Sequence, residues 1–354
     1  MNYDAILVVS FGGPESREDV IPFLENALRG RNVPRERMLS VAEHYYHFGG
    51  KSPINQQTRE LIAALENELA QHDLTRQVPK LPVYWGNRNW HPMLPETLQQ
   101  MHHDGIKRAL AFVTSAYSSY SGCRQYREDI ARAQNELGPG APQIDKLRPF
   151  FNHPGFIEAT EDRLRDAMQE IPADARRNVR IIYTAHSIPL SMANTCDYVL
   201  QLEEVRKLIS ARLGITNDAL VYQSRSGTPG QPWLEPDILD YLREVKARNS
   251  ASAVVLAPIS FISDHMEVLY DLDIEARQIC DSLALPMARA KTVGVHPKFI
   301  AMIRELILER TTEGMQRRAL GSLGPRPDVC EENCCPSPQR SVRPQTVHGK
   351  PRTA

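Results

Sequence analysis

Short β-rich runs alternate along this chain with longer segments of helical periodicity, and no other feature constrains the fold as strongly. The expected strands are six runs, at residues 5–10, 81–86, 108–115, 179–187, 219–224 and 253–258. Between them, apolar residues recur every three or four positions, as in "QQTRELIAALENELAQH" and "FIEATEDRLRDAMQEI". Because this order is typical of parallel sheets covered by helices on both faces, the sequence predicts an α/β protein.

The length of the chain predicts two domains. Its 354 residues exceed the roughly 250–300 at which a single core stops growing. The turn-rich segment "LGPGAPQIDKLRPFFNHPGF" (137–156) is expected to connect the two domains. We therefore predict an N-terminal α/β domain at residues 1–150, a C-terminal α/β domain at 151–323, and an extension at 324–354 whose last part is disordered.

The nearly neutral net charge of the chain excludes binding of a partner through a large overall excess of one charge. Lysine and arginine number 42 against 43 acidic residues, so the composition does not favour nucleic acid. No apolar run approaches the roughly 18 residues that a membrane span needs, and "MNYDAILVVSFGG" lacks the basic leader of a signal peptide. We expect a cytoplasmic protein whose six cysteines are thiols or metal ligands rather than disulfides.

Candidate site residues follow the expected strands. Ligands of open α/β sheets bind beyond the carboxyl ends of the strands, where "TAHSIP" and "PISFISDHMEV" place His186 and Glu267. A single histidine at a strand end is more often structural. Beside a carboxylate, however, an imidazole can take a proton or offer its lone pair to a metal ion, so a proton-handling or metal-holding pair is the alternative.

Three carboxylates, Glu267, Asp271 and Glu275, recur every four residues in "SDHMEVLYDLDIEA". On a helix this spacing stacks them along one face, where each like-charge pair costs about 0.2–0.5 kcal/mol. The row is either a solvated acidic face or a functional feature whose electrostatic cost something else compensates.

Two segments are candidates for anion binding. "LRGRNVPRER" clusters Arg29, Arg31, Arg35 and Arg37, either as the basic end of a helix or as a group that recognises carboxylates. In "GGKSPI" a glycine turn leads into a helix near Ser52, where free amides would suit an anion.

Cysteines are concentrated near the C-terminus. "CEENCC" carries Cys330, Cys334 and Cys335, and Cys123 lies in the expected strand-end loop "SGCRQY". Four thiolates suit an iron–sulfur cluster or tetrahedral zinc, and a free, oxidation-prone tail is the third interpretation. The other two cysteines are expected to be core residues.

The motifs "FGGPES", "GGKSPI", "TAHSIP", "GTPGQPWLEPD" and "SDHMEVLYDLDIE" occur in an order and spacing that resemble those of the ferrochelatases, enzymes that insert ferrous iron into a porphyrin. The likeness runs from about residue 3 to 315. It implies two Rossmann-like domains with parallel sheets flanked by helices and a porphyrin cleft between them. His186 and Glu267 match the family's catalytic metal-site pair, and Asp271 and Glu275 match an acidic ridge that carries iron or protons.

The resemblance also implies a porphyrin-binding set. Several family members carry a tyrosine at the position of Phe11, and that tyrosine can ligate product iron. Phe11 offers no oxygen ligand but could pack on the macrocycle. The residues that match holders of the porphyrin propionates are Arg29, Arg31, Tyr45, Ser52 and Tyr126.

Some ferrochelatases carry a 2Fe-2S cluster on a C-terminal cysteine extension, with one further ligand from the body of the protein. By this resemblance the ligands are Cys123, Cys330, Cys334 and Cys335, with zinc as the alternative. We expect a structural role, because such a cluster would tie the extension to the first domain.

The resemblance predicts a lyase that inserts ferrous iron into coproporphyrin III, giving coprohaem in haem biosynthesis. Coproporphyrin is preferred because the chain resembles soluble bacterial members with the "SGCRQY" and cysteine-tail pattern, and because four propionates suit a polar pocket rim. The alternatives are a protoporphyrin IX ferrochelatase giving protohaem, a porphyrin or haem carrier without catalysis, and a cobalt or nickel chelatase. Transient contacts with other enzymes of haem biosynthesis are compatible with this function.

Overall fold

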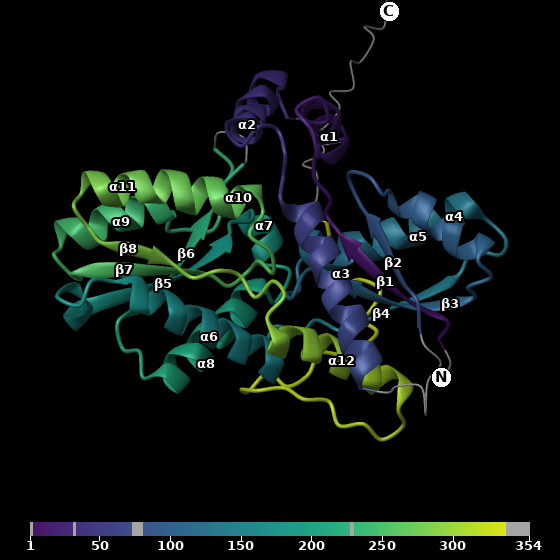
Figure 1. The fold of residues 1–354 in the computed structure, drawn as a ribbon. Helices are drawn as coiled ribbons and strands as arrows, with labels where there is room; N and C mark the ends of the chain where they lie inside the picture. The colour runs from purple at the N-terminus through teal and green to yellow at the C-terminus, as the bar shows by residue number, and fades with distance from the viewer. Residues whose placement is uncertain (1–2, 31–32, 73–80, 227–229, 338–354) are drawn as a thin grey trace, which may run out of the picture.

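The computed structural model describes residues 3–30, 33–72, 81–226 and 230–337. In this part of the chain, parallel strands form two four-stranded sheets with the orders β2-β1-β3-β4 and β6-β5-β7-β8 (Figure 1). The predicted α/β class with two parallel sheets is confirmed. The strands are β1 (Ala5–Ser10), β2 (Val83–Asn87), β3 (Arg108–Val113), β4 (Gln143–Lys146), β5 (Val179–His186), β6 (Asp218–Gln223), β7 (Ala253–Pro258) and β8 (Met287–Arg289).

The two sheets have the same topology, because the second strand order is the first with every number raised by four. β5 therefore corresponds to β1, and β7 corresponds to β3. In this order the chain changes its direction of winding between these two strands, and ligands of such sheets bind there, beyond the carboxyl ends. The topology thus marks one edge beyond Ser10 and an equivalent edge at His186.

Helices connect the strands and cover both sheets. The α-helices are α1 (Val20–Ala27), α2 (Arg35–His47), α3 (Ile54–Gln71), α4 (Leu94–His103), α5 (Gln125–Leu137), α6 (Pro154–Glu170), α7 (Leu190–Ala193), α8 (Tyr198–Leu213), α9 (Ile238–Ala247), α10 (Met266–Val268), α11 (Arg277–Ser282) and α12 (Pro297–Thr311). Two π-helical turns, η2 (Tyr120–Arg124) and η4 (Leu269–Ala276), and a 3-10 helix, η3 (Ala175–Asn178), are also present.

Alternate side chains of each strand pack on opposite faces of the sheet, as the two-residue repeat of a strand requires. In β1, Ile6 and Val8 pack with residues of α3, while Leu7 and Val9 pack with residues of α4 and α5. The second sheet lies between α6 and α8 on one face and α9 and α11 on the other (Figure 1). The cluster that contains Ile6 extends to Tyr183 of β5, so one continuous core joins both sheets.

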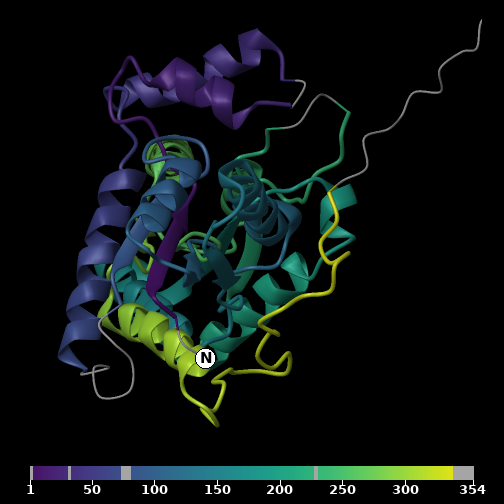
Figure 2. The ribbon, with the colours of Figure 1, turned by 90° about the vertical axis from the view of Figure 1, so that its right-hand side faces the viewer.

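Helices α1 and α2 form a separate pair with a small core of their own (Figures 1 and 2). Phe23 of this pair lies 6.2 Å from Phe11, which follows β1, and 6.3 Å from Trp90, which follows β2, measured between ring centroids. The pair therefore sits at the carboxyl ends of the first sheet, the edge at which a ligand is expected.

Two short strands are missing from the sequence-based prediction. β4 has the sequence "QIDK" and β8 the sequence "MAR", and both are edge strands without a long apolar run. Because β4 lies within residues 137–156, the segment expected to be a turn-rich connection is partly a strand.

The chain returns to its first half near its end. α12 packs on both α3 and α6. The segment after it reaches η2 and α5, where Arg124 and Arg127 donate hydrogen bonds to main-chain oxygens of residues 331–334. The domain boundaries at 150 and 323 stay a prediction, and the expected disorder concerns residues 338–354, which lie outside the described residues.

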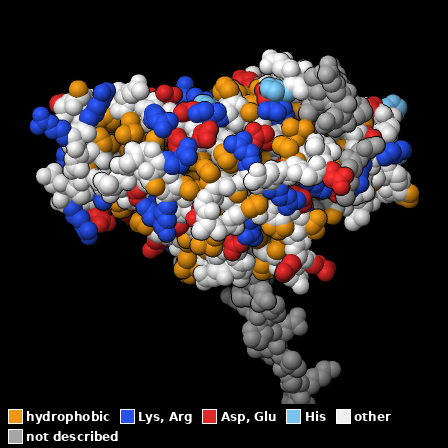
Figure 3. All heavy atoms as spheres, turned by 90° about the horizontal axis from the view of Figure 1, so that it is seen from below, with side chains coloured by type: hydrophobic (Ala, Val, Ile, Leu, Met, Phe, Trp, Pro, Cys, Tyr) orange, Lys and Arg blue, Asp and Glu red, His pale blue; other side chains and the backbone are white. Residues whose placement is uncertain are grey.

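Charged side chains of both signs are interspersed on the face shown in Figure 3, in keeping with the balanced composition. Within the four described ranges, no helix is both long and apolar enough to cross a membrane.

Candidate active site

His186 is the last residue of β5 and lies where the second sheet changes its winding direction. Its main-chain N–H donates to Ser260 Oγ at 3.0 Å, and Ser260 follows the neighbouring strand β7. Its carbonyl oxygen accepts a 3.0 Å hydrogen bond from Tyr198 Oη, at the start of α8. Hydrogen bonds to two other segments, the turn after β7 and α8, therefore hold the backbone of His186 in place.

The hydrogen bond of the imidazole determines which ring nitrogen is available. Nδ1 of His186 lies within hydrogen-bonding distance of the Ser187 carbonyl oxygen, which can only accept. Nδ1 therefore carries a proton, and in the neutral ring Nε2 keeps a lone pair for a metal ion or a proton. Nε2 lies 3.6 Å from Glu267 Oε2, so the structure brings the predicted pair together at a partly exposed position.

Glu267 is presented by the short helix α10. Its main-chain N–H donates to Nδ1 of His265, the residue that caps this helix, at 3.2 Å. Burial lowers the pKa of His265, which keeps the capping ring neutral and able to accept this hydrogen bond. Phe261 packs edge-on against His265 with a centroid distance of 4.8 Å, and lies 6.4 Å from the ring of His186.

The acidic row continues from α10 into the π-helical turn η4, so two helical elements of different type carry its three carboxylates. Asp271 is partly buried and accepts hydrogen bonds from Ser224 Oγ and, at 3.3 Å, from Gln223 Nε2. Burial, together with the charges of Glu267 and Glu275, raises the pKa of Asp271 to about 7. Burial also raises the pKa of Glu275. The row is therefore not a fully solvated acidic face.

Helix α2 contributes further groups beside this row. The ring of His44 stacks on Tyr270 of η4, with 3.7 Å between centroids and 9° between planes. Burial raises the pKa of Tyr45, and the charge of Glu267 adds to the shift, which places Tyr45 near the predicted metal-site pair. Arg37, at the start of α2, lowers the pKa of Glu275 against the larger effect of burial.

Phe11 and Tyr126 surround a buried guanidinium. Arg88, which follows β2, lies 5.8 Å from the Phe11 centroid and 4.5 Å from the Tyr126 centroid, and forms an ion pair with Asp129. Phe11 is 38% exposed, whereas Tyr126 is 5% exposed. Phe11 is therefore the more accessible of the two for packing on a ligand.

Aromatic contacts link Phe11 to Tyr45 of α2. Phe23 lies 6.2 Å from Phe11 and 5.7 Å from Tyr45, between ring centroids. Because Tyr45 is in turn near Glu267, the residues expected to bind porphyrin and those expected to bind metal belong to neighbouring parts of the molecule.

The sequence predicted free amides near Ser52 that could bind an anion, but two of these amides already have acceptors in the structure. The N–H of Ser52 donates to the Pro14 carbonyl at 2.9 Å, and the N–H of Ile54 donates to Ser52 Oγ at 3.4 Å. Ser52 itself is 3% exposed, pressed against Gly13, where an added Cβ would come within 2.8 Å of the Ser52 Cβ. Of the arginines assigned to propionates, Arg29 is exposed and Arg31 lies outside the described residues.

The four cysteines predicted to act together come from two distant segments. Cys123 is buried in the π-helical turn η2 rather than in a loop. A hydrogen bond from the Cys330 thiol lowers the pKa of Cys123, and the Lys146 ammonium contributes to the same shift. Burial raises the pKa of Cys335 to about 12, with smaller contributions from Cys123 and Cys334. Electrostatic interactions therefore connect all four thiols.

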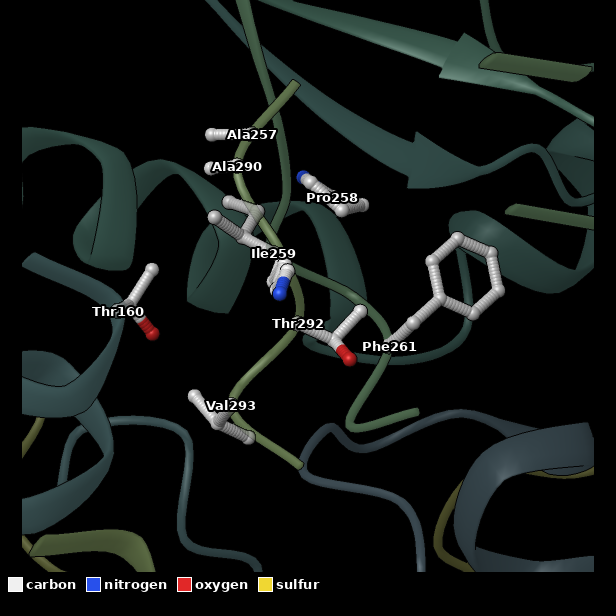
Figure 4. A pocket seen from close by; sticks show the side chains of 9 residues that line it. Thr160, Ala257, Pro258, Ile259, Phe261, Ala290, Thr292 and Val293 are labelled. Carbon is white, nitrogen blue, oxygen red and sulfur yellow. The ribbon is translucent and has the colours of Figure 1, made fainter. Parts of the chain in front are cut away.

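No three histidine, cysteine or acidic side chains are grouped closely enough to hold a single metal ion in the part of the chain that the structure describes. A small pocket beyond β7 is lined by residues that include Ile259, Phe261 and Thr292 (Figure 4). It has room for roughly one water molecule and does not include His186 or Glu267, so it is not a macrocycle site.

Several residues beside the site were missed by the sequence analysis. Gln223 is the last residue of β6 and Ser224 comes directly after it, and both end the strand predicted at residues 219–224, so their position at a strand end was a usable signal. No local pattern singles out Arg88, His44 or Tyr270, because their contacts come from other segments of the chain. The added residues are Gln223, Ser224, Arg88, His44 and Tyr270.

Comparisons with known proteins place this geometry in a family. The ferrochelatase family pattern matches residues 3–311. The chain is 53% identical to a ferrochelatase of Rhodopirellula baltica, covering 99% of this chain and 97% of that protein. It is 49% identical to the coproporphyrin III ferrochelatase of Streptomyces coelicolor, covering 97% of this chain and 95% of that protein.

Among solved structures, the sirohydrochlorin chelatase SirB of Bacillus subtilis in complex with cobalt has a similar fold. The TM-score is 0.51 at 13% identity, and the match covers 89% of this chain and 96% of that one. At this identity the likeness concerns the fold alone. With a family pattern over nearly its whole length and relatives at about half identity, the chain belongs to the ferrochelatase family.

Proposed function

We propose that this ferrochelatase inserts ferrous iron into coproporphyrin III in haem biosynthesis and that His186 and Glu267 are the residues that handle the metal. The observation that carries the assignment of residues is the 3.6 Å separation between His186 Nε2 and Glu267 Oε2, with Nδ1 of the same ring engaged by Ser187. The choice of coproporphyrin is supported by relatives of that name, such as the Streptomyces coelicolor enzyme.

The proposed chemistry exchanges one ferrous ion for two protons on the ring nitrogens. The lone pair on His186 Nε2 and the Glu267 carboxylate offer ligands to the ion as it loses water. The leaving protons need acceptors, and a carboxyl group whose pKa lies near neutrality is suited to receive and release them. Asp271, with a pKa raised to about 7 by burial and neighbouring charges, meets that requirement.

The porphyrin is proposed to lie between the two sheets, with Phe11 on one side and His186 on the other. Contacts to the propionates would offset the cost of bending the ring. The exposure of Arg29 supports this arrangement, as does the charge of Glu267, which contributes to the raised pKa of Tyr45. Ser52 and Tyr126 are buried, so their proposed contacts require that the ring reach the edge of the first sheet.

The test is anaerobic ferrous insertion with coproporphyrin III and protoporphyrin IX side by side, followed by porphyrin absorbance. We expect faster metallation of coproporphyrin and loss of metallation in His186→Ala. Faster use of protoporphyrin would favour protohaem as the product, and tight ring binding without metallation would favour a carrier. Competition with cobalt and nickel salts tests a chelatase for another metal.

We also propose that Cys123, Cys330, Cys334 and Cys335 hold a 2Fe-2S cluster. The mutual influence of the four thiols supports this set. Each iron of such a cluster takes two protein ligands, so three thiols need not surround one point, whereas structural zinc requires four ligands around a single ion. Cys335 has a φ of +46°, which turns the chain between the adjacent cysteines.

When bound, the cluster supplies a covalent connection between the extension and η2. Arg124 donates to the Cys334 carbonyl at 3.1 Å and Arg127 donates to the Glu332 carbonyl at 3.1 Å, and both side chains would orient the loop around it. We expect anaerobically purified protein to contain iron and acid-labile sulfide. Cys123→Ser should lose both and should have a Tm several degrees lower. Zinc without sulfide, or an unchanged Tm, would contradict this assignment.

We place the enzyme in the cytoplasm, in contact with haem-pathway enzymes only transiently. The balanced charge and the lack of a membrane-spanning helix among the described residues are compatible with this location. Fractionation of cells that express the tagged chain tests it.

A further inference from the structure

Ser224 has a backbone conformation that is costly for its residue type. It follows β6 with a φ of +62°, in the left-handed region that glycine adopts without strain and most other residues avoid. Its hydroxyl donates a hydrogen bond to Oδ2 of Asp271, which lies 47 positions further along the chain. The strained backbone therefore coincides with a contact to the acidic row.

Gln223, which precedes Ser224 and is 1% exposed, strengthens the same connection. Its Nε2 donates to Asp271 Oδ2 at 3.3 Å and to the main-chain oxygen of Glu267 at 3.4 Å. The end of β6 thus holds two residues of the row at once.

The pattern of these bonds leaves one carboxylate oxygen for a ligand. Ser224 and Gln223 both donate to Oδ2, and no hydrogen bond among the described residues reaches Oδ1. Asp271 also interacts electrostatically with Glu267 and Glu275, so its free oxygen belongs to the row that the proposed function assigns to iron or protons.

We propose that Ser224 is a positioning residue for metal insertion: its left-handed backbone aims the hydroxyl at Asp271 Oδ2, so that Oδ1 meets the iron or proton that passes along the row. The inference rests on the proposed function of this site. Glycine would adopt the same backbone conformation without strain, but it has no hydroxyl. Serine at this position therefore keeps the hydrogen bond to Asp271 at the cost of a strained backbone.

The test compares Ser224→Gly, Ser224→Ala and Ser224→Asn in the full chain. Ser224→Gly relieves the strain and removes the hydroxyl, so we expect an equal or higher Tm but a kcat/KM for ferrous iron lowered at least tenfold. Ser224→Ala should lose as much activity as Ser224→Gly but have a lower Tm than Ser224→Gly, because alanine keeps the backbone strain. Asparagine tolerates the left-handed region and carries a donor, so Ser224→Asn should recover part of the rate.

Ala284→Gly is the matched control. Ala284 lies between α11 and β8 with a φ of +48°, away from the acidic row, so glycine there relieves the same kind of strain. We expect a higher Tm with unchanged kcat and unchanged KM for both substrates.

Porphyrin binding is a second control for Ser224→Gly. The dissociation constant for porphyrin, from fluorescence quenching, should be the same in wild type and in Ser224→Gly.

The outcomes separate this inference from the function on which it rests. Wild-type kinetics in Ser224→Gly, with His186→Ala inactive, would overturn the role of Ser224 and leave the proposed site standing. A change in the KM for porphyrin rather than for iron would also overturn it, since the hydroxyl would then contact the ring. Metallation that survives His186→Ala would overturn both.

Discussion

The tautomer of the neutral His186 ring is set by a single main-chain oxygen. The Ser187 carbonyl can accept but not donate, so it keeps a proton on Nδ1 and leaves Nε2 for chemistry. In the neutral ring, the Nε2 atom that lies 3.6 Å from Glu267 Oε2 has a lone pair rather than an N–H group. This arrangement favours an ion or a transferred proton between the two groups.

Glu267→Gln should separate proton and metal handling from porphyrin binding. The amide has the size of the carboxylate but neither its charge nor its ability to accept a proton, so we expect kcat to fall by about 10²-fold or more. Porphyrin affinity should remain close to wild type in fluorescence titrations. Glu267→Asp, which keeps the charge at a greater distance, should lose less, and equal losses in both variants would contradict a role for the charge.

His153 is a second residue whose environment controls its protonation. It caps α6 by accepting a hydrogen bond from Gly155 N at 3.1 Å. Burial, with the charges of Arg148 and Arg318, lowers the pKa of His153 to about 3. Glu305 lies 3.4 Å from Nε2, but Glu305 also pairs with Arg318 at 2.7 Å, so the neutral ring is favoured.

The low pKa of His153 predicts a loss of stability in acid. An unfolded histidine titrates near pH 6.5, so between that pH and about 3 the unfolded state binds a proton that the folded state does not. The free energy of unfolding should therefore fall as the pH decreases through this window, by at most about 1.4 kcal/mol per pH unit from this group.

His153→Asn keeps a capping acceptor but does not titrate. Urea denaturation as a function of pH should show a flatter acid slope for this variant, while both proteins keep a constant stability difference above roughly pH 7.5. Identical slopes would mean that His153 is protonated in the folded state.

Among the elements, η4 explains how an acidic row can be placed beside the site. π-Helical turns are rare in proteins, and those that do occur often lie at functional sites. Leu272 and Ala276 point into the core, each 0% exposed, while Asp271 and Glu275 remain partly exposed. Tyr270 contacts His44 of α2, so the same turn connects the second sheet to the α1–α2 pair.

The turn between α2 and α3 offers a matched pair of glycines. Gly49 and Gly50 both have positive φ, +73° and +84°. An added Cβ would meet nothing within 4 Å at Gly49, but would come within 2.4 Å of the Arg17 Cα at Gly50. Gly49→Ala should therefore cost only the left-handed strain, about 1–2 kcal/mol.

Gly50→Ala should cost clearly more, because the backbone at Arg17 has to move. Chemical denaturation measures the difference between the two variants. Equal losses would show that the close approach of these segments is not rigid.

For the whole molecule, a buried ion pair ties the crossover after β4 to the last helix. Arg148 and Glu309 have side chains 1% and 2% exposed, and their atoms form two hydrogen bonds, at 2.7 and 2.8 Å. Arg148 also donates to the Arg318 carbonyl at 2.9 Å. The first half of the chain is thus connected to α12 and to the segment that follows it.

Arg148→Met should lower the free energy of unfolding by about 3–5 kcal/mol, because it leaves the Glu309 carboxylate buried without its partner. The double variant Arg148→Met with Glu309→Leu removes that charge and should recover much of the loss. Thermal and urea unfolding of both variants test this coupling, and additive losses would contradict it.

The sequence by itself determined the α/β class, most of the strands and the strand-end positions of His186 and Glu267. These features depend on periodicity and on neighbouring residues, which a local window contains. The roles of this pair follow from the resemblance of their motifs to the ferrochelatases, and the family match supports that resemblance.

Only the tertiary structure decided which distant groups act on these residues. It brought Ser224 to Asp271, Cys330 to Cys123 and α12 back to α3. It also placed the short edge strands β4 and β8, which have no long apolar run of their own and form strands by pairing with β3 and β7. The physical reason is that such contacts depend on packing summed over the whole core, and no local segment carries that information.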